Sequence, residues 1–319
     1  MKKPASVTTG IRLFILSAIF VTVYSCSKTD PPPVIPPNSS LTYMLALGTG
    51  TTIFNSAVIK AGLDSVFSGP AIFTLLVPTD QACTNSGYTQ TVIDGYSRDQ
   101  ARAWVLYQTY AGSALTFESF IGAKDRKLIT ADGDSVFVSG DSNRTYVNGY
   151  QFLNSEVVAS NGIMLAMQNV LVPPSQNLYQ MMSTDTSLSF FTEAIQLSSA
   201  VPDSLSSLLS NGGPFSVLAP YNNAFRNKGY TSPSDLTTVN ADSLRTLVLL
   251  SLIPQRLFSY DVGDSTMLTT YGDSTLIFYL QGLLTTVRVL GSDTSSNIIS
   301  ANQMATNGVL FKIDALLEP

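Results

Sequence analysis

Hydrophobic and polar positions follow the same order twice along this chain. Each time, a helical stretch rich in Leu and Ala comes first, at residues 52–66 and 188–209, and a short apolar run stopped by proline follows it. A second helical stretch comes next, at residues 98–110 and 241–253. We therefore predict the same succession of helices and strands in both halves of the chain.

The last third of each half alternates apolar and polar residues between turn-forming segments, as half-buried strands do. Helices followed by such a meander are typical of α+β domains, mainly β here, with an antiparallel sheet. The runs that predict strands are Asp134–Val138, Thr145–Val147, Thr275–Tyr279 and Thr285–Val289.

Two sequence boxes also recur, at nearly the same spacing. The first contains the run Phe-Thr-Leu-Leu-Val-Pro or Phe-Ser-Val-Leu-Ala-Pro, and its prolines lie 142 positions apart; the second opens with Asn-Gly and recurs after 146 positions. Such self-similarity predicts a duplicated domain of about 140 residues, a usual size for one core. The boxes are Ile72–Cys83 and Pro214–Phe225, then Asn161–Pro173 and Asn307–Pro319, and we place the domains at residues 41–174 and 175–319.

Residues 1–25 have the pattern of an export signal. Lys2, Lys3 and Arg12 precede an apolar run that is too short for a permanent membrane span, which needs about 20 residues. The run ends just before Cys26 and resembles the bacterial lipobox, where a peptidase cuts before a cysteine acylated on its sulfur. The alternative is an ordinary secretory signal with an incidental cysteine. The resemblance predicts anchoring to membrane lipid through Cys26, at the outer membrane, on its surface or its periplasmic face.

Residues 26–40 are rich in proline and lack a periodic apolar pattern, which predicts an extended tether. At about 3.1 Å per residue, such a tether would hold the folded part some ~40 Å from the lipid. Cys83 is then the one remaining cysteine, so an intramolecular disulfide cannot form. We expect Cys83 and Trp104 to be core residues.

Composition excludes several functions. A net charge of −5 with 17 scattered Lys and Arg residues gives no footprint for nucleic acid. The chain has no histidine, which removes histidine-based nucleophile pairs, general bases and metal sites, and we expect no cofactor. Carboxylates remain for catalysis, but Asp134, Asp141, Asp264 and Asp273 all stand in a repeated Gly-Asp-Ser tripeptide that favours turns. No segment has the spacing of a calcium loop.

The Phe-Thr-(apolar)₃-Pro-Thr-Asp-x-Ala box, followed by Asn-Gly and a final Val-Leu-x-Pro or Leu-Leu-x-Pro, resembles the two signature boxes of fasciclin domains. The resemblance covers about residues 41–319 and implies, in each copy, a wedge-shaped β-sandwich of about seven strands with a layer of helices. It also implies a role in adhesion or extracellular binding. Many fasciclin domains carry Tyr-His after the central helix; here Tyr107-Gln108 and Leu250-Ser251 stand there, so that motif is not intact. Tyr107 and Gln108 are the candidate binding residues.

Three functions are compatible with these features. The first is a membrane-anchored, non-enzymatic adhesion or binding lipoprotein, whose partner would be extracellular matrix, a glycan or another surface protein. The second is an accessory glycan-binding component of an outer-membrane nutrient-uptake system. The third is a carboxylate-dependent hydrolase using residues such as Asp134 or Asp264. The duplicated boxes and the missing histidine favour the first.

Overall fold

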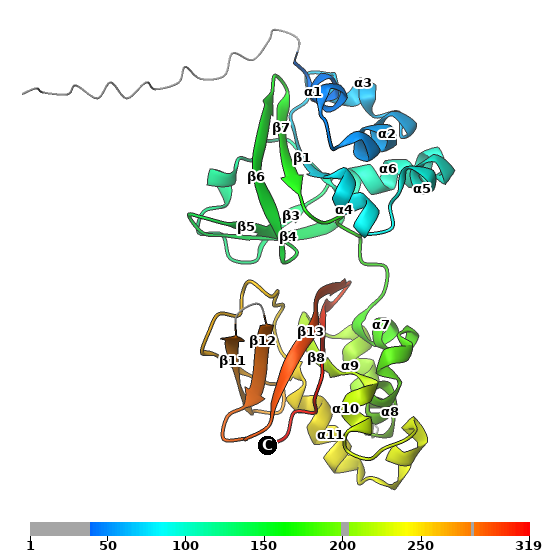
Figure 1. Cartoon of the computed structure of the whole chain (residues 1–319), viewed down its shortest axis with the longest axis vertical. Helices are drawn as coiled ribbons and strands as arrows, with labels where there is room; N and C mark the ends of the chain where they lie inside the picture. Colours follow the sequence, from blue (N-terminus) through cyan, green and yellow to red (C-terminus); the bar gives the residue numbers. More distant parts are fainter. Residues whose placement is uncertain (1–38, 199–203, 282–283) are drawn as a thin grey trace, which may run out of the picture. The chain divides into compact units, whose positions relative to one another are not determined.

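The computed structural model describes residues 39–198, 204–281 and 284–319 (Figure 1). The predicted signal at residues 1–25, Cys26 and nearly all of the tether lie outside these residues. Within the described ranges, no helix has both the length and the apolar character needed to cross a membrane.

The seven strands of the two halves follow the same succession, as the sequence pattern predicts, and the helices differ only in short segments. The first repeat consists of α1 (Leu41–Leu47), α2 (Thr52–Lys60), α3 (Asp64–Phe67), β1 (Phe73–Pro78), α4 (Asp80–Asn85), α5 (Gln90–Gly95), α6 (Arg98–Tyr107), β2 (Thr109–Ala111), η1 (Phe117–Phe120), β3 (Arg126–Ile129), β4 (Ser135–Gly140), β5 (Thr145–Val147), β6 (Tyr150–Ala159) and β7 (Gly162–Met167). The second consists of α7 (Leu178–Thr184), η2 (Thr186–Leu188), α8 (Ser189–Leu197), α9 (Leu205–Asn211), β8 (Phe215–Pro220), α10 (Asn222–Arg226), η3 (Pro233–Thr238), α11 (Ala241–Leu250), β9 (Leu252–Ile253), β10 (Thr266–Thr269), β11 (Thr275–Gln281), β12 (Leu284–Val289), β13 (Ser295–Ala305) and β14 (Gly308–Ile313).

Each repeat forms a mixed sheet of seven strands, in the order β2-β1-β7-β6-β5-β4-β3 and β10-β11-β12-β13-β14-β8-β9. The meander is antiparallel, as expected, but β1 pairs with β7 and β8 with β14 in parallel. The expectation of a wholly antiparallel sheet is therefore corrected. The reason is topological, because the two boxes from opposite ends of a repeat run side by side in the same direction.

Each sheet curls until its ends nearly meet. The long strands β6 and β13 carry register shifts, and such shifts bend a sheet. Strand β6 pairs with both β5 and β7, and β13 pairs with both β12 and β14. At the ends, the Ala131 amide just after β3 donates to the Thr109 carbonyl of β2, with N···O 2.7 Å, and Tyr271 does the same to Leu252 at 2.7 Å. Each domain is therefore a nearly closed, barrel-like sheet with helices, which confirms the predicted fold class.

The helices of each repeat lie together beside its sheet (Figure 1). The central helix α6 begins at a capping box, in which the Ser97 side chain accepts from the Gln100 amide and the Gln100 side chain accepts from the Ser97 amide. Its apolar face, with Ala101 and Val105, is buried. The predicted helix over residues 52–66 divides into α2 and α3 at Gly62, where φ is +64°, a value that favours glycine.

The glycine of the Asn-Gly pair that opens the second box is required by the parallel pairing. Gly162 lies opposite Phe73, and Gly308 lies opposite Phe215. A methyl group on either glycine would overlap the carbonyl oxygen of its phenylalanine partner. Glycine thus lets the two box strands approach each other at the start of each parallel pair.

Candidate binding site

The predicted binding residues Tyr107 and Gln108 lie in the core. Both are fully buried at the end of α6. The Tyr107 hydroxyl donates to the Ser135 carbonyl at 3.4 Å and accepts from Asn148 Nδ2 at 3.4 Å, and burial raises its pKa above the usual value. Gln108 Nε2 donates to the Trp104 carbonyl at 3.4 Å. Because α6 runs straight into β2, its last residues face the sheet, and no ligand could touch this pair without rearrangement of the fold.

The candidate carboxylates lie in turns. Gly133-Asp134-Ser135, Gly140-Asp141-Ser142 and Gly272-Asp273-Ser274 connect antiparallel neighbours, which confirms the predicted hairpin turns. The fourth tripeptide, which contains Asp264, precedes β10 instead, and the Asp264 carboxylate accepts from the Leu280 amide at 3.1 Å. Burial and the neighbouring Asp132 raise the pKa of Asp134. Asp132 Oδ1 accepts from the Asp134 amide at 3.2 Å, so the two residues build the turn.

Polar residues of the first box accept hydrogen bonds from backbone amides at the starts of helices. The Thr79 hydroxyl accepts from the Ala82 amide at 3.1 Å and caps α4. Asp80 reaches further and accepts from the Ile53 amide, at 2.8 Å, in the first turn of α2. Asn222 occupies the same place in the second repeat, because its Oδ1 accepts from the Phe190 amide of α8 at 3.3 Å. These box residues join two helices and are not arranged around a ligand.

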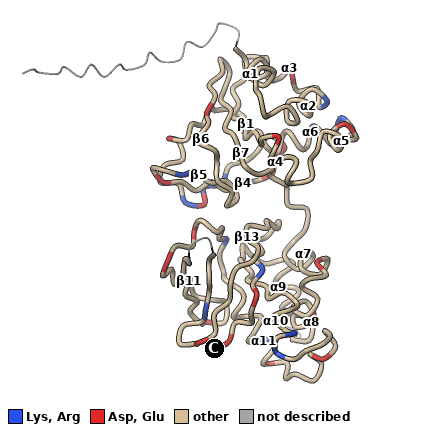
Figure 2. Tube along the Cα trace, in the orientation of Figure 1, with Lys and Arg blue, Asp and Glu red and all other residues tan. Residues whose placement is uncertain are grey.

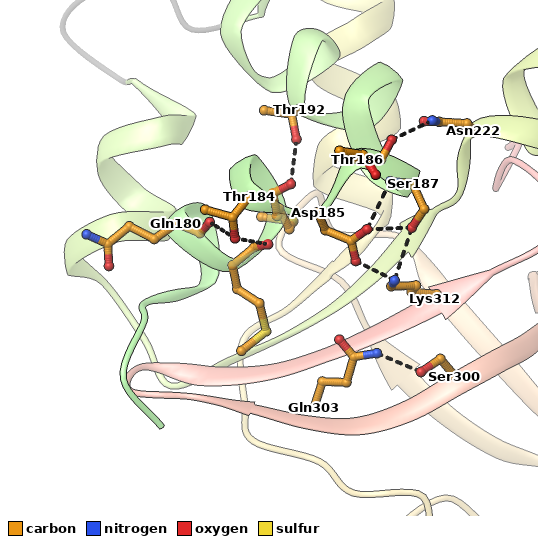
Figure 3. A network of polar contacts seen from close by, with 12 residues as sticks. Gln180, Thr184, Asp185, Thr186, Ser187, Thr192, Asn222, Ser300, Gln303 and Lys312 are labelled. Carbon is orange, nitrogen blue, oxygen red and sulfur yellow. Dashed lines mark hydrogen bonds and ion pairs between the residues drawn. The ribbon is translucent and has the colours of Figure 1, made fainter. Parts of the chain in front are cut away.

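A polar network in the second repeat ties a helical turn to the sheet (Figure 3). Lys312 on β14 forms an ion pair with Asp185, and its Nζ also donates to the Ser187 hydroxyl at 3.0 Å. Burial alone would raise the pKa of Asp185, but hydrogen bonds from Lys312 and Ser187 outweigh it and hold that pKa below the usual value. Both oxygens of the Asp185 carboxylate are paired, one with Lys312 and the other with Ser187, which indicates a structural role. We call this set of contacts the lock between β14 and η2.

Charged residues are sparse and scattered along the described chain (Figure 2). Only 12% of the residues are Asp, Glu, Lys or Arg. Among the residues that the structure describes, no three Cys, Asp or Glu side chains gather in a way that could hold a metal ion.

The second repeat has an apolar pocket of about 320 Å³ beside α11. Its lining includes the buried residues Phe225, Leu244 and Leu250. The half-buried residues Tyr230 and Val239 also line it, as does the segment Leu316–Pro319. Ser243 and Thr246 add exposed hydroxyls from the first turns of α11. The volume lies at the lower end of the range for small-ligand pockets, which suits one ring or one side chain.

Sequence reasoning missed this pocket, although the repeat carried a signal for it. The central helix Arg98–Tyr107 of the first repeat aligns with Ala241–Leu250 of the second. In this alignment, Leu247 is the counterpart of Trp104. Trp104 is 5% exposed and is the core residue that the sequence predicts. Its smaller counterpart lines the pocket.

The comparison with family models decides the family. The model of the fasciclin domain matches this chain twice, over residues 49–173 and 187–319. This chain belongs to the fasciclin family. The matched ranges contain both copies of the two boxes, so the two repeats described above are tandem fasciclin domains. Fasciclin domains are typically non-catalytic adhesion modules.

The fasciclin relatives of this chain include large animal proteins. It is 26% identical over 302 residues to the transforming growth factor-beta-induced protein ig-h3 of the rabbit, Oryctolagus cuniculus, and 22% identical over 293 residues to human periostin. The matches cover 90% of this chain in both cases, but 39% of the rabbit protein and 32% of periostin. The chain therefore spans about a third to two fifths of the length of these relatives.

A solved fasciclin domain pair is also similar. The FAS1 domain pair of the insect cell adhesion molecule fasciclin I matches 85% of this chain and 97% of its own, with 16% identity and a TM-score of 0.41.

Proposed function

We propose that this chain is a membrane-anchored, non-enzymatic adhesion or binding protein that acts through its two fasciclin domains. The observation that carries the proposal is the double match to the fasciclin model, over residues 49–173 and 187–319. The lack of histidine and the turn positions of Asp132 and Asp134 support a binding role over catalysis. The partner would be extracellular matrix, a glycan or another surface protein.

The N-terminal sequence supports the anchoring part of the proposal. The signal-like residues 1–25, the cysteine at position 26 and the proline-rich segment that follows have the order of a lipid-anchored protein on a spacer. Two similar modules on one anchored chain can convert weak contacts into firm attachment when both engage together. Anchoring and tandem domains therefore belong to the same proposed mechanism.

A deletion and complementation experiment tests the proposed function. Cells of the native host that lack the gene are complemented with wild-type protein or with Cys26→Ser, and attachment is measured on matrix-coated, glycan-coated and protein-coated surfaces. We expect attachment to fall on deletion, to return with wild-type protein, and not to return with Cys26→Ser, which should appear in the soluble fraction. Unchanged attachment of the deletion strain on every surface would contradict the adhesive role. Membrane retention of Cys26→Ser would contradict the lipid anchor.

A further inference from the structure

The apolar pocket of the second domain occupies a place that the first domain fills with its own tryptophan. In the first domain, Trp104 packs between two rings, with centroid distances of 5.7 Å to Phe54 and 5.5 Å to Tyr88, and it stacks on Tyr88 at an interplanar angle of 29°. In the second domain, Tyr230 corresponds to Tyr88 and Leu247 to Trp104. Tyr230 and Leu247 both line the pocket.

The smaller Leu247, which stands where the first domain has Trp104, does not leave the core of the second domain poorly packed. Two larger residues line the pocket, since Phe225 replaces Cys83 and Leu244 replaces Ala101. Phe225 stacks on Phe190, with ring centroids 5.4 Å apart and an interplanar angle of 15°. The pocket beside Leu247 is therefore lined by packed, buried apolar residues and also reaches exposed ones, as a binding pocket does.

The remaining walls and the rim suit an aromatic ring carried by a peptide. Leu236 and Val239 line the pocket ahead of α11, and the C-terminal segment lines it with Leu317. A ring inserted there would meet the Tyr230 ring, as Trp104 meets Tyr88, and aromatic pairs of this kind gain energy beyond their buried area. The exposed Ser243 hydroxyl offers a hydrogen-bond partner to a backbone that stays outside, and the Thr246 hydroxyl, which donates to the Asp242 carbonyl at 2.9 Å, can accept from it.

From this correspondence, we propose that the pocket of the second fasciclin domain binds a tryptophan side chain presented by a partner protein. The bound ring replaces, from outside, the indole that the first domain supplies from its own helix. This inference rests on the proposed binding function and names the chemistry that one of the two domains recognises. Tryptophan is also among the residues that most often dominate protein interfaces.

A peptide-binding experiment with the full chain tests the inference. The probe is the pentapeptide Gly-Gly-Trp-Gly-Gly carrying 5-fluorotryptophan, observed by ¹⁹F NMR, with Gly-Gly-Leu-Gly-Gly as competitor and free indole as a separate arm. We expect the tryptophan peptide to bind, the leucine peptide to compete at least tenfold more weakly, and Leu247→Trp to weaken binding at least tenfold by filling the pocket. Ile59→Trp is the matched control, because it adds a tryptophan at an exposed position of the first domain and should leave binding unchanged.

Several results would overturn the inference. Equal binding by wild-type protein and Leu247→Trp would remove the pocket as the site, and binding of free indole without the peptide would remove a protein partner. Val239→Trp fills the pocket from a lining residue outside α11, so the test survives if circular dichroism shows that Leu247→Trp does not fold. Beads coated with wild-type protein or with Leu247→Trp are tested for attachment to the same matrix-coated, glycan-coated and protein-coated surfaces. This experiment separates the pocket inference from the proposed adhesive function. Attachment retained by Leu247→Trp refutes the pocket alone, whereas no attachment by wild-type protein refutes the adhesive function.

Discussion

One asparagine in each domain holds three backbone segments together. Asn161 Oδ1 accepts from the Leu41 amide at 2.8 Å, and its Nδ2 donates to the carbonyls of Phe67 and Gly69 at 2.8 Å. Asn307 repeats this arrangement with Leu178, Leu209 and Gly212. The asparagine of the second box therefore connects the first helix of the domain with the backbone that precedes the first box strand.

We predict that Asn161→Ala lowers the free energy of unfolding of the first domain by about 2–4 kcal/mol, since three hydrogen bonds are lost and buried backbone groups remain unpaired. Urea denaturation followed by Trp104 fluorescence measures this loss. Asn154→Ala is the control, because Asn154 is exposed on β6 and its change should stay within about 0.5 kcal/mol. An equal effect of the two substitutions would show that the hydrogen bonds of Asn161 do not stabilise the fold.

The buried Cys83 gives a second prediction at this scale. Burial, assisted by the charge of Asp80, raises the pKa of Cys83 to about 12, so the thiol stays protonated at pH 8. We expect iodoacetamide to leave Cys83 unmodified in native protein and to modify it fully in urea. Peptide mass spectrometry assigns the label and separates Cys83 from Cys26. Rapid modification of the native protein would contradict the burial of this residue.

Single residues were predictable where the sequence placed them in a regular pattern. Cys83 and Trp104 lie at apolar positions of helices, so their burial followed from the sequence. The burial of Tyr107 and Gln108 did not, because it depends on the strand that follows α6. The pocket depends on the volume that Leu247 leaves unfilled. The pattern of apolar and polar residues within one helix does not predict such a volume.

The meander strands and the central helices followed from periodicity, but the pairing of the strands did not. The predicted helices over residues 98–110 and 241–253 end at Tyr107 and Leu250, and strands β2 and β9 follow them. Alternation predicted the meander strands, and proline marked the end of β1 and β8. The parallel pairing of β1 with β7 joins residues 89 positions apart, from Phe73 to Gly162, and alternation within a strand carries no information on its neighbour. The one sequence signal for this pairing was the repetition of both boxes, because the first and the second box occur together in each domain.

The lock between β14 and η2 gives a prediction on pH. The pKa of Asp185 is lowered in the folded state, so the stabilisation is fully present above the unfolded pKa of about 3.9 and is lost as pH falls through the folded value. Lys312→Ala installs the residue that β7 has at the matching position, Ala166, and removes the partner. We expect it to cost roughly 1–2 kcal/mol at pH 7 and clearly less at pH 2–3.

Urea denaturation followed by circular dichroism at both pH values measures this difference. Lys228→Ala is the matched control, because the side chains of its ion pair with Glu318 are about 40% exposed and such pairs contribute little. A cost for Lys312→Ala that is the same at pH 7 and at pH 2–3 would show that the ion pair with Asp185 is not its cause.

At the scale of the whole molecule, every strand pair of the described residues joins two strands of the same domain. Each sheet has a strand from the second box between a meander strand and a strand from the first box, so neither sheet is complete until the last part of its domain is present. Each copy of the duplicated sequence thus forms a sheet of its own, and no strand pairs across the two copies in the described residues.

A chain that ends at Thr306 tests this division, since it lacks β14, the strand between β13 and β8. We expect the second domain to lose its fold, with a large loss of circular dichroism, because two parts of its sheet would have no strand between them. Trp104, the single tryptophan, packs within the first domain against Phe54 and Tyr88 and should keep a cooperative fluorescence transition in urea. The reciprocal variant, Leu165→Asp in the buried strand β7, should abolish that transition and preserve the signal of the second domain. Loss of both domains in either variant would mean that the two sheets, although paired separately, cannot fold without each other.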